Sequence, residues 1–185
     1  MNLILTEASR SCIMVIDPQE RLMKVVQQPE TVVKNTAILL QCAQVLKIPV
    51  IASTQYKKGL GPIVEELSSL LTKAFCFDKM EFNCFLNPLF RAILAKLPAS
   101  VDTLVLTGVE AHICVFQTAV AAMNHGFKVW VASDAVSSRV EQNKTEALSL
   151  LQSGGACCAG TETITYQLLK RADTSQFKSM LKYLK

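Results

Sequence analysis

The 185 residues are half hydrophobic and only 18% charged, which excludes an intrinsically disordered chain and is enough for one substantial core. The net charge of +4 is modest, and lysines and arginines are scattered, with the densest stretch from Lys170 to Lys185. We therefore expect no nucleic acid partner. Seven cysteines, an odd number, lie mostly in apolar runs without the CxxC and histidine pairs of a zinc site, which favours a reducing compartment.

The N-terminus does not resemble a signal or transit peptide, and no apolar run approaches the length of a membrane span. Together with the cysteine usage, this predicts a cytoplasmic protein without membrane contact. No internal repeat, low-complexity segment or linker divides the chain. We expect a single domain over residues 1–185, and its high apolar content favours a homo-oligomer.

Apolar runs and helical spacing alternate along the chain. In chain order, the first half predicts a strand at 12–16, a helix at 31–46, a strand at 50–52, a loop at 57–62, a short strand at 74–77 and a helix at 88–97. The second half predicts a strand at 104–106, a helix at 111–125, a strand at 129–131, a helix at 141–153, a strand at 156–159 and helices at 161–170 and 174–184. This alternation is typical of an α/β protein, with helices on both faces of a six-stranded, mostly parallel Rossmann-like sheet.

Cys114 is the strongest candidate for a nucleophile. It lies in the first turn of the helix that follows the fourth strand, where unpaired N–H groups and the helix dipole favour a thiolate. Because most free cysteines are small apolar core residues, a purely structural role is the alternative.

Two charged residues are expected near Cys114. Ligands of open parallel sheets bind beyond the C-terminal strand ends, and the commonest strand order places the first strand beside the fourth. Asp17, at the end of the first strand, would then share a crevice with Cys114, unless it only caps a turn. Lys79 follows the third strand and could stabilise a thiolate, although alone it would be read as a surface lysine. Asp17→Asn is expected to change the thermal stability little, or even to raise it, because a buried carboxylate is costly unless paired.

Asp17 after a buried strand, Lys79 in mid-chain and GVEAHIC at residues 108–114 together resemble the isochorismatase-like cysteine hydrolases. The resemblance covers residues 11–169, and TQYKKGLGP at 54–62 and DAVSSR at 134–139 are similar to the eukaryotic isochorismatase domain-containing proteins. It implies a three-layer α/β/α isochorismatase-like hydrolase fold.

The resemblance also implies an Asp-Lys-Cys triad of Asp17, Lys79 and Cys114, and a cis peptide at Val109-Glu110. By resemblance, the N–H groups of Glu110 and Cys114 would bind the oxyanion. The Glu110 side chain is expected to be a surface group without a catalytic role.

The substrate pocket and a possible metal site are expected in the same crevice. Candidates for the pocket wall are Gln55, Phe82 and His112, with a supporting role for His112 as the alternative. His125, the second histidine, is expected to interact with the C-terminal end of its helix. Metal-dependent nicotinamidases carry an Asp-x-His element after the second strand, whereas residues 53–57 here read STQYK. We therefore expect no metal and no other cofactor.

The resulting prediction is a hydrolase that cleaves a small amide or related C–N bond through a thioester. One alternative is hydrolysis of an isochorismate-type vinyl ether, which needs an acid but no thiol. Another is a catalytically idle binding or scaffold protein, and a role in nucleic acid processing has the least support.

Overall fold

A computed structural model describes residues 5–184. Its centre is one six-stranded sheet in the order β3-β2-β1-β4-β5-β6, in which all neighbouring strands are parallel. The strands are β1 (Ser11–Ile16), β2 (Val50–Gln55), β3 (Phe75–Lys79), β4 (Thr103–Val109), β5 (Lys128–Ser137) and β6 (Cys157–Ala159). This arrangement confirms the predicted fold class, including the placement of the first strand beside the fourth.

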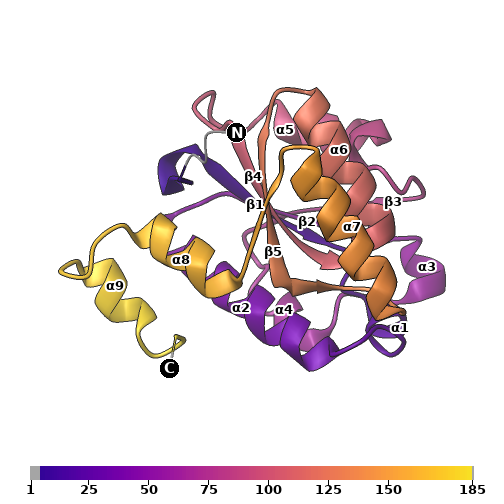
Figure 1. The fold of residues 1–185 in the computed structure, drawn as a ribbon, viewed down its shortest axis with the longest axis horizontal. Helices are drawn as coiled ribbons and strands as arrows, with labels where there is room; N and C mark the ends of the chain where they lie inside the picture. The colour runs from indigo at the N-terminus through magenta and orange to yellow at the C-terminus, as the bar shows by residue number, and fades with distance from the viewer. Residues whose placement is uncertain (1–4, 185) are drawn as a thin grey trace.

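Helices cover both faces of the sheet (Figure 1). One face packs against α5 (Pro88–Leu94), α6 (Phe116–Asn124), α7 (Glu141–Ser153) and the 3-10 turn η2 (Cys84–Leu86). The other face packs against α2 (Pro29–Leu46), α4 (Glu65–Ser68), α8 (Thr161–Leu169) and α9 (Ser175–Met180). The remaining short helical elements are η1 (Ala8–Arg10), α1 (Glu20–Met23), α3 (Lys57–Leu60) and η3 (Ala111–Val115). None of the helices within residues 5–184 is both long and apolar enough to cross a membrane.

The two cores explain why β1 reads as a continuous apolar run. Met14 and Ile16 belong to the cluster under α6, whereas Ile13 and Val15 belong to the cluster under α2. A strand with both faces covered is predominantly apolar, and all six residues of β1 are buried, five of them apolar and only Ser11 polar.

The structure corrects one predicted element, extends several strands and shortens two predicted helices, since α5 ends at Leu94 and not at 97, and α9 ends at Met180 and not at 184. Residues 57–60 form the helical turn α3 instead of part of a loop, because the Gly59 and Leu60 N–H groups both donate to the Tyr56 carbonyl. The strand β5 continues to Ser137, well beyond its apolar start, since its second half carries polar residues that an apolar-run criterion cannot recognise.

Close contact between β1 and β4 depends on Gly108. A Cβ atom at this position would lie 2.0 Å from the Ile16 carbonyl oxygen, and the backbone φ of +110° is one that other residues rarely adopt. Glycine therefore lets β4 run tightly beside β1 up to the point where both strands deliver their side chains to the same edge.

Candidate active site

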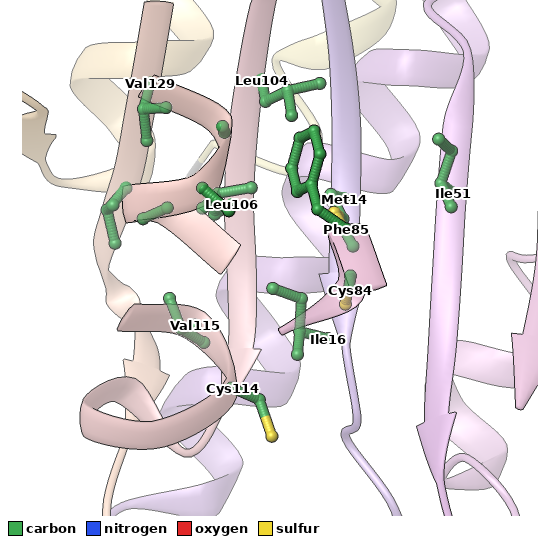
Figure 2. Close-up of a cluster of buried hydrophobic side chains, with 14 of the residues drawn as sticks. Met14, Ile16, Ile51, Cys84, Phe85, Leu104, Leu106, Cys114, Val115 and Val129 are labelled. Atoms are coloured by element: carbon green, nitrogen blue, oxygen red, sulfur yellow. The ribbon is translucent and has the colours of Figure 1, made fainter. Parts of the chain in front are cut away.

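Three strand ends bring Asp17, Lys79 and Cys114 together. Asp17 follows β1 directly, Lys79 is the last residue of β3, and Cys114 lies in a turn after β4. The Lys79 Nζ atom is 2.6 Å from Asp17 Oδ2 and 3.6 Å from Cys114 Sγ. Figure 2 shows Cys114 at the margin of the apolar cluster that contains Ile16 and Val115. The three residues that the sequence singled out thus form one compact group at the C-terminal edge of the sheet.

Lys79 uses all three of its N–H donors within this group. Besides Asp17 and Cys114, it donates to Gln55 Oε1 at 2.6 Å. The Gln55 amide is fixed in turn, because its Nε2 donates to the Met80 carbonyl at 2.8 Å. Gln55 was expected in the pocket wall; its Oε1 accepts from Lys79 and also lies 3.9 Å from Cys114 Sγ.

The Asp17 carboxylate accepts from two sides. Its Oδ2 accepts a hydrogen bond from Lys79 Nζ, and its Oδ1 accepts one from the Ser53 hydroxyl at 2.7 Å. Both side chains of the ion pair have no solvent exposure. Asp17 also adopts a left-handed backbone conformation with φ of +50°, which is uncommon outside glycine and often found at functional residues.

Two buried polar residues of the group were missed by the sequence reasoning. Ser53 is fully buried in β2, and Gln19 is fully buried after β1. Gln19 Oε1 accepts from the Gln55 N–H at 2.6 Å and its Nε2 donates to the Gly61 carbonyl at 2.7 Å. A serine directly after the apolar start of β2 was an available signal, whereas nothing in the sequence reveals where the Gln19 amide points.

Electrostatics differ from the expectation of a resting thiolate. Burial, followed by the negative charge of Asp17, raises the pKa of Cys114 to about 12, and the nearby Lys79 charge only partly offsets this. Burial acts to lower the pKa of Lys79, but the negative charge of Asp17 above all outweighs it and raises that pKa above its usual value. The resting group is therefore a neutral thiol beside an Asp17–Lys79 ion pair.

Cys114 lies in an unusual turn. Residues Ala111–Val115 form a single π-helical turn, η3, before α6 begins. The Glu110 carbonyl accepts from the Ile113 and Val115 N–H groups, and the bonds described to this carbonyl do not include the Cys114 N–H. The Val109-Glu110 peptide is cis. Single π turns of this kind are frequent at functional positions.

The Glu110 side chain is not the expected surface group. It is buried and accepts from the Arg139 backbone N–H at 2.8 Å and from Arg139 Nε at 3.1 Å. A carboxylate can be buried here because it is both paired and hydrogen-bonded.

His112 and Phe82 lie apart from the ion pair in different ways. The His112 Nδ1 is 2.9 Å from the Ser138 hydroxyl, and its Nε2 is 3.4 Å from Asn143 of α7, so these contacts fit the supporting role. Phe82 is 52% exposed beyond β3, and its place in a pocket wall stays a prediction. His125 Nδ1 lies 2.8 Å from the Ala121 carbonyl, as expected for a partner of the C-terminal helix end.

Metal ligands do not gather around this group. Within residues 5–184, no three His, Cys, Asp or Glu side chains are placed so that they could hold a metal ion together. All seven cysteines are free thiols. Metal independence remains a prediction about the reaction.

Comparison with known proteins identifies the family. Residues 11–163 match the isochorismatase domain. The chain is 35% identical to a secreted isochorismatase effector of Phytophthora sojae, over 95% of this chain and 84% of that protein. It is 34% identical to isochorismatase domain-containing protein 2 of Rattus norvegicus, over 95% and 81% of the two chains.

Solved structures share the fold. The structure of a MAR1 ribonuclease from Caenorhabditis elegans superposes with a TM-score of 0.91 at 30% identity, covering 98% of this chain and 92% of that one. An octameric Escherichia coli hydrolase of unknown specificity, YcaC, matches with a TM-score of 0.90 at 22% identity, over 99% and 92% of the chains. The chain therefore belongs to the isochorismatase family of hydrolases.

Proposed function

We propose that this hydrolase cleaves a small amide or related C–N bond through a thioester on Cys114, with Asp17 as the base and Lys79 as the electrostatic partner. The observation that carries the proposal is the position of Lys79 Nζ, which contacts both Asp17 Oδ2 and Cys114 Sγ while fully buried. A nucleophile, a base and a cation within hydrogen-bonding reach form the arrangement that covalent catalysis requires.

The raised pKa of Cys114 determines how the first step proceeds. Because the resting thiol is neutral, its proton passes to Asp17 as Sγ attacks the carbonyl carbon. The Lys79 charge stabilises the sulfur while this proton leaves. The carbonyl oxygen becomes the oxyanion, which the N–H groups of Glu110 and Cys114 receive.

The remaining steps return the enzyme to its starting state. Collapse of the tetrahedral intermediate breaks the C–N bond, and Asp17 gives its proton to the leaving amine. Water then attacks the thioester and loses a proton to Asp17, the C–S bond breaks, and the acid product leaves with Cys114 again protonated.

The contacts of Asp17 bear on the vinyl-ether alternative. That reaction needs a carboxylic acid to protonate the substrate, yet both Asp17 oxygens accept hydrogen bonds, from Ser53 and from Lys79. The resting side chain is thus hydrogen-bonded as an acceptor on both oxygens and not as an acid donor, which favours amide hydrolysis over a reaction that begins with protonation of the substrate.

RNA cleavage is the rival suggested by the name of the C. elegans relative. A nuclease needs cations that contact phosphate, whereas the Lys79 ammonium has no solvent exposure and spends its three donors inside the group. We therefore place RNA second. A homo-oligomer and a cytoplasmic location also stay predictions.

An ammonia-release screen over small amides tests the proposal, with RNA and an isochorismate-type vinyl ether as further substrates. Active compounds are then given to the variants C114A and K79M, with C158A as a matched control for the loss of a thiol. Amide turnover that is lost in C114A and K79M but kept in C158A supports the proposal. RNA or vinyl-ether turnover that survives in C114A would replace it with the corresponding rival.

A further inference from the structure

The turn that carries Cys114 is tied to the end of β5 through Glu110. Arg139 lies two residues beyond β5, and its backbone N–H donates to Glu110 Oε2 at 2.8 Å. Its Nε lies 3.1 Å from both carboxylate oxygens. We call this Glu110–Arg139 contact the clamp. The Glu110 side chain is only 6% exposed, so its carboxylate is stable there only while the clamp is made.

Further hydrogen bonds hold Arg139 and its neighbour Ser138 in place beside the clamp. His112 bonds to Ser138, the neighbour of Arg139, at 2.9 Å. The same segment is anchored from the other side, since the Gln27 N–H donates to the Ser138 carbonyl at 3.0 Å and the Gln27 amide donates to the Arg139 carbonyl at 3.0 Å. Ser138 and Arg139, which directly follow β5, are therefore held in place by these bonds and can restrain the turn that carries Cys114.

The other polar groups of Glu110 show what the clamp controls. The Glu110 carbonyl is occupied by the N–H groups of Ile113 and Val115. With the carboxylate held by Arg139 and the carbonyl held by η3, the backbone of Glu110, which carries the N–H of the preceding peptide, is restrained from both sides. Loss of the carboxylate contacts would remove one of these two restraints on the Glu110 backbone.

We propose that Glu110 is a positioning residue, whose clamp to Arg139 aims the backbone N–H of Glu110 at the oxyanion that forms when Cys114 attacks a carbonyl. The inference rests on the proposed function and adds a role for a side chain that takes no part in the proton transfers. A misplacement of about 1 Å can cost a hundredfold in rate, so a remote carboxylate can matter this much.

Two reactions of the same thiol separate this role from a structural one. Acylation by 4-nitrophenyl acetate forms the Cys114 thioester, expels 4-nitrophenolate and passes through an oxyanion. Alkylation by iodoacetamide forms a C–S bond, expels iodide and creates no oxyanion. A residue that only stabilises the turn affects both reactions, whereas one that aims the oxyanion donor affects acylation alone.

The experiment measures both rates at Cys114 by peptide mass spectrometry in wild type, E110A, E110Q and R139A. We expect E110A to slow acylation by about 10- to 100-fold, because one oxyanion donor is worth about 100- to 1000-fold and misplacement loses part of it. Alkylation of Cys114 should stay within about twofold. E110Q keeps an acceptor for the Arg139 N–H and should lose far less than E110A.

D102A is the matched control. Asp102 precedes β4 as Glu110 follows it, and its carboxylate also pairs with an arginine, Arg10. Its removal should leave both rates unchanged. If E110A fails to fold, R139A serves instead, because the Arg139 side chain is 59% exposed and its loss spares the backbone N–H. R139A should slow acylation more than alkylation.

Three outcomes would overturn the inference: unchanged acylation in both E110A and R139A, equal slowing of acylation and alkylation, or the same loss in D102A. These outcomes are distinct from failure of the proposed function. If the proposed function were wrong, Cys114 of the wild type would not be acylated, and C114A would keep its turnover.

Discussion

Replacing Asp17 with asparagine removes the charge that faces Lys79 while nearly preserving side-chain shape. The sequence alone predicts little change in stability, and the ion pair reverses that expectation. Both side chains are fully buried, with Lys79 Nζ 2.6 Å from Asp17 Oδ2, so D17N leaves an uncompensated ammonium in the interior. Removing one partner of such a pair typically costs about 3–5 kcal/mol. For a chain of this size we expect the melting temperature to fall by roughly 6–20 °C.

The double variant D17N/K79M sharpens this prediction. Replacing both members of a buried pair with neutral groups is often nearly neutral, so the double variant should be more stable than D17N alone. Urea unfolding can be followed by the fluorescence of Trp130, the single tryptophan, which is buried in β5. D102N is the control, because Asp102 is partly exposed and its pair should contribute much less. A shift of less than about 1 kcal/mol in D17N, or strictly additive losses in the double variant, would refute the reasoning.

Three further predictions concern pH, thiol reactivity and metals. Burial raises the pKa of Cys12, Cys42 and Cys114 to about 12 from 9.0, so these thiols stay protonated longer in the folded chain. These thiols then leave the free energy of unfolding unchanged below about pH 9 and should lower it as the pH rises from about 9 to 12. A urea midpoint that stays constant over this range would contradict the raised pKa values. Iodoacetamide should label Cys76 faster than Cys114, because Cys76 is exposed and Cys114 is buried. Preferential labelling of Cys114 in peptide maps would show that its thiol is more accessible and more acidic than the structure indicates. Amide turnover should survive dialysis against a strong chelator, since Ser53, Thr54 and Gln55 offer only neutral metal ligands where metal-dependent nicotinamidases carry Asp and His. Activity that is lost and restored only by added zinc, iron or manganese would reveal a metal centre.

Sequence patterns predict the sheet well because its strands are buried on both faces. The run from Cys12 to Ile16 is apolar because both faces of β1 are covered. Position 108 is glycine because a side chain there would collide with the Ile16 backbone. The second half of β5 is different: its residues include Ser133, Asp134 and Ser137, and only pairing with β4 makes it a strand. Likewise, α3 depends on the Tyr56 carbonyl, which no periodicity reveals.

The same contrast applies to the candidate active site. Asp17, Lys79 and Cys114 each follow a strand, so the topology of a parallel sheet brings them together and the motifs predict them. The pKa of Cys114 was mispredicted because helix position and a nearby lysine are visible in sequence, whereas the depth of burial is not. Glu110 was misassigned to the surface for a related reason, since its partner Arg139 lies 29 positions away along the chain.

The most direct test of the central claim is capture of the acyl-enzyme on Cys114. Wild-type protein and C114A are mixed with 4-nitrophenyl acetate, quenched in acid within the first turnover and mapped by peptide mass spectrometry, with C158A treated in parallel. The account predicts one acetyl group on Cys114 in wild type and C158A, and none in C114A, together with loss of ester and amide turnover in C114A. Full turnover by C114A, or acetylation of wild type at another residue while Cys114 stays free, would contradict it.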